Sequence, residues 1–212
     1  MLILALDVLN EKRAIDIAAD VEDYISMIKV NYPLVLSSGI EIIKKLSKIK
    51  PVIADFKIAD IPYTSSLIAE IAFENNAKAI ITHGFVGKDV IEAVKKVADE
   101  YGGEVYVVTE LSSEGGREFM AKFSDKIVEI ANETGCDGLI VPATRSERIK
   151  EIRRKTSLKL IAPGVITQGG EIRDTLEAGA DGIIVGRAIY NAKNPKEEAK
   201  KIWELIKKYK KI

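Results

Sequence analysis

The stretch Pro51-Val52-Ile53-Ala54-Asp55-Phe56-Lys57-Ile58-Ala59-Asp60-Ile61-Pro62 joins a short apolar run to a cluster of charges. An apolar run without polar alternation is typical of a strand buried on both faces, as in a parallel sheet covered by helices. Because successive side chains of a strand point to opposite faces, we expect Asp55 and Lys57 to share one space and Phe56 to point away. An ion pair that merely closes the end of a sheet would also explain these charges, so the rest of the chain must decide.

Similar apolar runs recur along all 212 residues, separated by amphipathic segments. In these segments apolar residues lie three and four positions apart, which is typical of helices packed against a sheet. The expected strands are 2–6, 27–30, 52–54, 79–82, 105–109, 138–141, 160–162 and 182–185, and the expected helices are 11–21, 63–74, 88–101, 118–133, 145–155 and 196–211. Since no linker or low-complexity tract interrupts it, the pattern predicts an α/β protein with a single (β/α)8 TIM-barrel domain over residues 1–212.

Two segments share one design, GCDGLIV at 135–141 and GADGIIV at 179–185. In each, the first glycine is expected to end a helix and the Asp-Gly pair to turn into a buried strand. We interpret both as turn chemistry, and Cys136 as a small core residue.

Composition narrows the class of partner. Lys plus Arg equals Asp plus Glu at 32 each, so the sequence predicts neither a nucleic-acid nor an anionic-membrane partner. The single cysteine cannot form an internal disulfide, and we find neither a cleavable signal nor a long apolar run, so we expect a cytoplasmic protein. The single histidine, His83, is expected to be a polar wall residue at the end of a strand.

Polar residues follow the expected strands at the end where barrels of this kind carry their active sites. They are Asp7, Lys29, Asp55, Lys57, His83-Gly84, Glu110-Leu111-Ser112-Ser113, the segment 163–170, and Gly186-Arg187. The last two segments predict a phosphate site, because glycines let backbone N–H groups approach an anion and Arg187 adds a bidentate cation.

Five segments together resemble the orotidine 5′-monophosphate decarboxylase family in its short, archaeal type. They are Leu4-Ala5-Leu6-Asp7, Ile28-Lys29-Val30, the 55–62 stretch, Pro163-Gly164-Val165 with Gln168-Gly169-Gly170, and Val185-Gly186-Arg187. The resemblance implies conversion of orotidine 5′-monophosphate to uridine 5′-monophosphate in pyrimidine biosynthesis, without metal or cofactor. It further implies that Lys29, Asp55, Lys57 and Asp60 form an alternating charge tetrad, in which Lys57 protonates a carbanion at C6.

The same resemblance implies a homodimer, in which Asp60, Ile61 and Thr64 reach the partner's active site. The other implied substrate contacts are Asp7 and Lys29 to ribose hydroxyls, Ser112 to the pyrimidine, and Gln168, Gly186 and Arg187 to the phosphate, with Pro163, Val165, Gly169 and Gly170 along the same loop and Tyr190 near that end of the ligand. Many relatives carry His-Pro-Gly after the serine where this chain has Ser113-Glu114-Gly115, so Ser113 competes with Ser112.

Two other functions fit part of the pattern. Magnesium-dependent enzymes of the same superfamily, such as 3-keto-L-gulonate 6-phosphate decarboxylase and hexulose 6-phosphate synthase, share the Asp-x-Lys-x-x-Asp signature. In them a strand-two glutamate helps bind the metal, whereas this chain has Lys29, which would repel a cation. A non-catalytic phosphate-binding barrel would need the phosphate loop alone and leaves the charged tetrad without a role.

Overall fold

Eight parallel strands close into a barrel in the computed structural model, which describes residues 1–209. Each strand pairs with the next along the chain, and β1 also pairs with β8, so the sheet has no free edge. The strands are β1 (Leu2–Leu6), β2 (Met27–Asn31), β3 (Val52–Ile58), β4 (Ala77–His83), β5 (Glu104–Val108), β6 (Gly138–Ile140), β7 (Lys159–Pro163) and β8 (Gly182–Val185). The predicted TIM barrel is confirmed.

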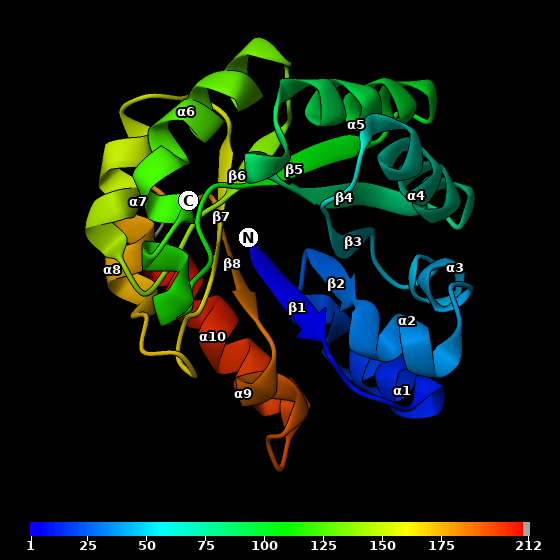
Figure 1. Ribbon diagram of the computed structural model, residues 1–212. Coiled ribbons are helices and arrows are strands. Elements are labelled where there is room, and N and C mark those ends of the chain that lie inside the picture. The colour runs from blue at the N-terminus through cyan, green and yellow to red at the C-terminus, as the bar shows by residue number, and fades with distance from the viewer. Residues whose placement is uncertain (210–212) are drawn as a thin grey trace.

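Helices surround the barrel on its outer face (Figure 1). They are α1 (Glu11–Val21), α2 (Tyr32–Ser38), α3 (Ile42–Leu46), α4 (Pro62–Glu74), α5 (Lys88–Glu100), α6 (Met120–Glu133), α7 (Ser146–Arg153), α8 (Ile172–Glu177), α9 (Arg187–Tyr190) and α10 (Pro195–Tyr209), with 3-10 turns at Glu22–Tyr24, Gly84–Val86 and Glu114–Arg117. The six predicted helices are confirmed to within a few residues, although positions 210 and 211 of the last one lie outside the described residues. The sequence did not predict α2, α3, α8 and α9, because segments of seven residues or fewer are too short to display helical periodicity.

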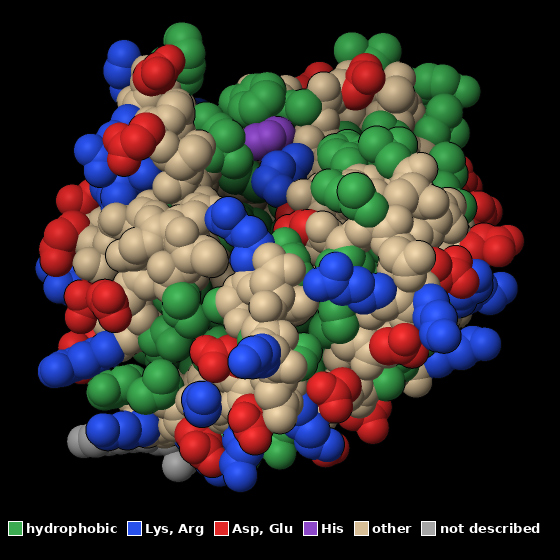
Figure 2. Space-filling model, turned by 90° about the horizontal axis from the view of Figure 1, so that it is seen from below, with side chains coloured by type: hydrophobic (Ala, Val, Ile, Leu, Met, Phe, Trp, Pro, Cys, Tyr) green, Lys and Arg blue, Asp and Glu red, His purple; other side chains and the backbone are tan. Residues whose placement is uncertain are grey.

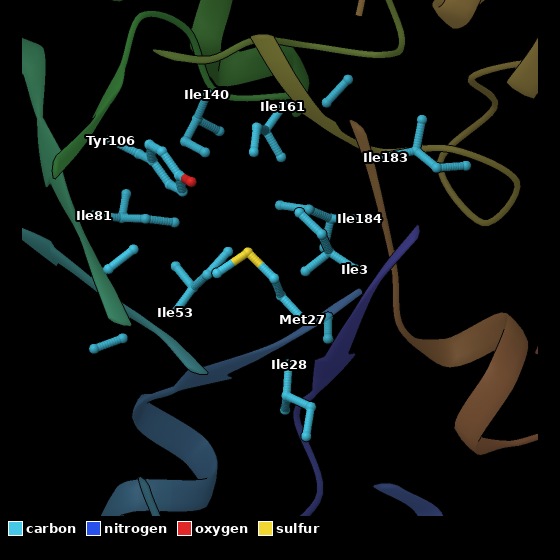
Figure 3. Packing of buried hydrophobic residues seen from close by; sticks show 14 of the residues in the cluster. Ile3, Met27, Ile28, Ile53, Ile81, Tyr106, Ile140, Ile161, Ile183 and Ile184 are labelled. Atoms are coloured by element: carbon cyan, nitrogen blue, oxygen red, sulfur yellow. The ribbon is translucent and has the colours of Figure 1, made fainter. Parts of the chain in front are cut away.

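The barrel interior is filled by side chains that alternate with outward-facing ones. In Figure 3 Met27 points into the barrel and Ile28 away from it, and Ile184 and Ile183 show the same alternation. The inward group meets near the axis and includes Ile3, Ile53, Ile81, Tyr106, Ile140 and Ile161. All of these residues are buried, so the interior of the barrel is a packed core.

Strand β3 departs from regular pairing where its charges begin. Ala54 pairs with Ile80 and Ile58 with Thr82, so four steps along β3 face two steps along β4. Within this bulge Lys57 has a φ of 41°, a left-handed conformation that costs energy for a residue with a side chain. The strand therefore does not end at residue 54 as expected but carries Asp55 and Lys57 within an irregular segment.

The repeated Gly-x-Asp-Gly segments form turns as predicted, and their aspartate side chains also accept hydrogen bonds from the preceding strand. Gly135 and Gly179 adopt positive φ angles of 65° and 106° after α6 and α8. The carboxylates of Asp137 and Asp181 accept hydrogen bonds from the backbone N–H groups of Val105 and Leu160, each at 2.9 Å. Both segments thus tie one strand to the next at the end opposite the predicted site.

Between residues 1 and 209, no helix combines the length and hydropathy that a membrane span requires.

Candidate active site

A cavity of about 210 Å³ opens at the carboxyl ends of the strands. Figure 2 views this end and shows basic side chains on both sides of a central hollow, with the histidine beside it. Of the predicted site residues, the cavity is lined by Asp7, Lys29, Asp55, Lys57, Ser112, Pro163, Val165, Gln168, Gly186 and Arg187, together with Tyr190. Strand ends far apart in the sequence therefore converge as the barrel rule predicts.

Asp55 forms the centre of a compact ion cluster. Its Oδ2 lies 2.8 Å from Lys29 Nζ and its Oδ1 lies 2.8 Å from Lys57 Nζ, so one carboxylate holds two ammonium groups. The Asp55 side chain is 4% exposed and that of Lys29 7%, whereas Lys57 is 31% exposed and faces the opening. The cluster is therefore buried at its base and accessible at Lys57.

The cluster keeps its members charged despite burial. Burial alone raises the pKa of Asp55, but attraction to Lys29 and Lys57 outweighs it and the pKa lies below its ordinary value. Burial alone lowers the pKa of Lys29, but Asp55 and then Asp7 outweigh it and the pKa lies above its ordinary value. Asp7 Oδ1 lies 3.6 Å from Lys29 Nζ and is buried, whereas the Asp7 side chain as a whole is 35% exposed and lines the cavity. The carboxylate can therefore accept a hydrogen bond from a ligand hydroxyl at its exposed side.

The aromatic ring beside Asp55 packs away from the cavity, as the alternation predicted. Phe56 is buried and stacks on Tyr32, with ring centroids 5.6 Å apart. The Tyr32 hydroxyl donates a hydrogen bond to the Phe56 carbonyl, which fixes the backbone between Asp55 and Lys57. The sequence reasoning missed Tyr32 and the cavity-lining Asn31, although Asn31 is the first polar residue after Ile28-Lys29-Val30 and the strand-end rule could have included it.

The glycine-rich loop after β7 is folded tightly by its own backbone. The N–H of Gly170 donates to Gly164 O at 3.1 Å, and the N–H of Ile166 donates to Gly170 O at 2.8 Å. A side chain at position 170 would meet two carbonyl oxygens at 2.9 Å, so glycine is required there. The loop presents Gln168 to the cavity beside Arg187, while Gly169 lines an adjoining recess and Gly170 lines neither. Thr167, which belongs to the predicted 163–170 segment but was given no role of its own, also lines the cavity.

The two serines after β5 differ in their position relative to the cavity. Ser112 lines both the cavity and the adjoining recess, whereas Ser113 lines the recess alone. The Ser112 carbonyl accepts a hydrogen bond from Thr144 Oγ1 at 2.9 Å. Ser112 is therefore the serine that faces the interior of the barrel mouth.

The remaining predicted residues lie outside this cavity. Asp60 is exposed and its carboxylate accepts a hydrogen bond from the Ile61 N–H at 2.7 Å, and Ile61 is 64% exposed. Thr64 lies in the first turn of α4, which begins at Pro62, a residue suited to the start of a helix. Asp60, Ile61 and Thr64 do not line the cavity of their own chain, and their predicted place at the partner's cavity stays a prediction.

His83 ends β4 as a partly buried wall residue. Its ring lies 4.7 Å from that of Phe85, and its Nδ1 is buried without a hydrogen-bond partner. Burial and then the Lys57 ammonium lower its pKa below the ordinary value, so the imidazole is neutral near pH 7. Across residues 1–209, no group of three or more His, Cys, Asp or Glu side chains is arranged to hold a metal ion.

The model of the Orotidine 5'-phosphate decarboxylase / HUMPS family matches residues 1–202. Orotidine 5'-phosphate decarboxylase from Methanococcoides burtonii is 53% identical over 203 residues, covering 95% of this chain and 94% of that protein. A crystal structure of orotidine 5'-monophosphate decarboxylase from Methanocaldococcus jannaschii, complexed with inhibitor BMP, has a TM-score of 0.94 at 50% identity, with 97% of each chain covered. The Pyrococcus horikoshii enzyme has a TM-score of 0.90 at 49% identity, covering 98% of this chain and 99% of that one. Shared sequence, fold and length show that this chain belongs to the Orotidine 5'-phosphate decarboxylase / HUMPS family.

Proposed function

We propose that this protein decarboxylates orotidine 5′-monophosphate to uridine 5′-monophosphate in pyrimidine biosynthesis. The observation that carries the proposal is the Lys29-Asp55-Lys57 cluster, with both ammonium groups 2.8 Å from one carboxylate at the base of a cavity. Relatives of nearly equal length at about half identity bear the name of this enzyme, which supports the assignment.

The reaction demands a fixed cation beside the reacting carbon. Loss of CO2 from C6 of the pyrimidine leaves an electron pair in the ring plane, which ring resonance hardly relieves. Lys57 supplies the cation and then transfers a proton to C6, after which the product carries a C–H bond where the carboxylate was. Its partial exposure towards the cavity supports this role, because the ammonium group can reach a ligand while Asp55 holds it.

Asp55 and Lys29 position Lys57 and set the charge around it. A substrate carboxylate bound next to Asp55 is repelled, and this repulsion is relieved when CO2 departs. One preorganised donor contributes roughly 3–4 kcal/mol, while the largest enzymatic accelerations require about 20 kcal/mol. Lys57 therefore cannot act alone, and binding energy from the distant phosphate helps to assemble the site.

The other end of the cavity holds the ribose and phosphate. Arg187 and Gln168 lie at the loops after β8 and β7 and bind the phosphate, with backbone groups of Gly186 beside them. The partly exposed Asp7 carboxylate accepts a hydrogen bond from a ribose hydroxyl, and Ser112 forms a hydrogen bond with the pyrimidine. Pro163, Val165, Gly169 and Gly170 shape the loop that covers this part of the ligand.

The functional unit is a homodimer that places Asp60, Ile61 and Thr64 of each chain at the partner's cavity. Tyr63, Leu67 and Ile71 are exposed at four-residue steps and so share one face of α4, next to the exposed Ile61. Apolar side chains on one face of a helix mark a protein contact. Asp60 then completes the charge tetrad from across the interface.

A complementation experiment tests this sharing of sites. Lys57→Ala and Asp60→Asn are expected to be inactive as separate proteins. When the two chains are unfolded together and refolded, each heterodimer regains one site with both residues intact, so activity rises in proportion to the heterodimer content. If Asp60 serves the cavity of its own chain, every site in the heterodimer keeps one defect and no activity returns.

The remaining properties follow the sequence expectations. We infer one barrel domain over residues 1–212 that works in the cytoplasm and has neither a nucleic-acid nor a membrane partner, as the equal numbers of acidic and basic residues support. The reaction uses neither metal nor cofactor, because this chain has the cation Lys29 where a metal site would need an oxygen ligand.

Absorbance of orotidine 5′-monophosphate mixed with EDTA-treated protein tests the function. Loss of the substrate band with formation of uridine 5′-monophosphate is expected for the wild type but not for Lys57→Ala. Activity that appears only when Mg2+ and a sugar phosphate are supplied would instead assign the chain to the hexulose-phosphate synthase side of the family. Binding of uridine 5′-monophosphate without turnover would indicate a non-catalytic barrel.

A further inference from the structure

Glu110 is a buried carboxylate that the proposed chemistry leaves without a role. Asp55 and Glu110 are the two buried acidic residues among residues 1–209, and the side chain of Glu110 is 0% exposed. It follows β5 and lines the cavity two residues before Ser112. A buried charge is costly unless it is paired, so its partners indicate what it holds in place.

Two arginines from the next part of the barrel converge on this carboxylate. Arg148 Nε donates to Glu110 Oε1 at 2.8 Å from within α7, and Arg145 Nη2 lies 3.3 Å from Glu110 Oε2 at the residue before α7. The same Arg145 nitrogen donates to the Leu111 carbonyl at 2.5 Å. One guanidinium group thus joins the Glu110 side chain to the backbone that leads into Ser112.

The Ser112 segment depends on such contacts for its shape. Between β5 and the 3-10 turn at Glu114–Arg117 the chain has no regular pairing beyond the N–H of Thr109, which donates to Ile140 O at 3.1 Å. If Glu110 were neutral, Arg145 and Arg148 would lose the anion that orients them, and the hold on the Leu111 carbonyl would weaken. The Ser112 side chain would then lose its fixed position at the cavity.

We propose that Glu110 is a positioning residue, whose carboxylate orients Arg145 and Arg148 and thereby places Ser112 against the base of the bound nucleotide. This inference rests on the proposed function, because it assigns Ser112 to the pyrimidine. It concerns the base end of the ligand alone, since the phosphate end is held by residues after β7 and β8.

The test is a double-mutant cycle with a matched control. Glu110→Gln keeps the size of the side chain and removes its charge, and Glu151→Gln makes the same change on the exposed partner of the same Arg148. We expect Glu110→Gln to lower kcat/KM for orotidine 5′-monophosphate about 10- to 100-fold, and Glu151→Gln to change it less than about twofold. In a protein that already carries Ser112→Ala, Glu110→Gln should lower kcat/KM less than about threefold, because the Ser112 hydroxyl that Glu110 positions is absent.

Binding separates this role from a general structural one. Calorimetry should show that Glu110→Gln weakens the binding of uridine 5′-monophosphate. The affinity for ribose 5-phosphate should stay within about twofold of the wild-type value. The proposal would be overturned if Glu110→Gln weakened the binding of both ligands equally. It would also be overturned if the effects of Glu110→Gln and Ser112→Ala on kcat/KM multiplied in the double variant. If the wild type binds these ligands but does not decarboxylate, the proposed function fails while the binding comparison still decides the role of Glu110. Should Glu110→Gln not fold, Arg145→Gln takes its place in the same cycle with the same expected pattern, because Arg145 is the residue that joins Glu110 to the Leu111 carbonyl.

Discussion

Asp55→Asn removes the centre of the buried ion cluster without changing its shape. The wild-type cluster of Asp7, Lys29, Asp55 and Lys57 is electrically balanced. In the variant two ammonium groups face a neutral amide, where each was 2.8 Å from a carboxylate oxygen. Lys29, whose side chain is 7% exposed, keeps only the looser contact with Asp7 at 3.6 Å. The substitution therefore leaves a buried charge without adequate compensation.

The expected loss of unfolding free energy follows from this burial. Removing one partner of a buried ion pair destabilises proteins by about 3–5 kcal/mol. Because Lys57 is partly exposed and Asp7 still faces Lys29, we expect the lower end, about 3 kcal/mol. The exposed Asp16→Asn on α1 makes the same chemical change and is expected to stay within about 0.5 kcal/mol of the wild type.

Urea denaturation at one protein concentration and several pH values measures both effects. Using one protein concentration keeps the effect of protein concentration on any dimer dissociation the same in all samples. The folded-state pKa of Asp55 is lowered, so its contribution is present above its unfolded pKa and is lost as the pH falls through the lower folded value. The wild type should thus lose its advantage over Asp55→Asn in acid, while it keeps its advantage near pH 7.

Two results would refute this reasoning. An Asp55→Asn protein as stable as Asp16→Asn at pH 7 would show that the two lysines tolerate each other without the carboxylate. A stability difference that persists unchanged into acid would show that the loss arises from packing and has no electrostatic origin.

Three further changes give distinct outcomes. Lys57→Ala should abolish decarboxylation but shift the urea midpoint little, because Asp55 keeps its ion pair with Lys29. Substantial residual turnover would show that Lys57 is not the proton donor. Arg187→Ala should raise KM for orotidine 5′-monophosphate about 10- to 100-fold, yet leave the reaction of the phosphate-free nucleoside unchanged; equal effects on both would argue against a phosphate contact. Gly84→Ala should lower the unfolding free energy by about 1–3 kcal/mol, because its methyl group would lie 2.1 Å from Ile127 Cγ2. Gly115→Ala places its methyl group where nothing lies within 4 Å and should leave the unfolding free energy unchanged in the same urea denaturation experiment.

The long elements of the barrel could be read from local pattern. Strands such as β1 and β8 are apolar runs bounded by turns, and α1 and α5 repeat their apolar residues over three turns, so periodicity identifies both. The short α9 could not be found in this way, because four residues carry no period. Its consequence is local, since Arg187 proves to be the first residue of a helical turn as well as the end of a loop.

The candidate site was predictable in membership more than in arrangement. A strand-end rule brings Asp7, Lys29 and Arg187 to one mouth, because parallel strands in a barrel all end on the same side. It gives no information about the bulge that holds Lys57 at a positive φ. It places Glu110 at the mouth but says nothing about its role, which depends on arginines 35 and 38 positions away. Contacts of this kind depend on the packing of distant segments.

The sequence by itself determined the fold class, the polarity of the barrel and the residues available at its mouth, because hydrophobic periodicity and turn chemistry act between neighbours in the chain. The tertiary structure decided which charges meet. The pairing of β2 with β3 and the irregular register between β3 and β4 bring Lys29 and Lys57 onto the two oxygens of Asp55. Asp60 does not line the cavity of its own chain. Ion-pair geometry depends on distances of a few ångströms, which are set by packing across the whole barrel and are not encoded in any single segment.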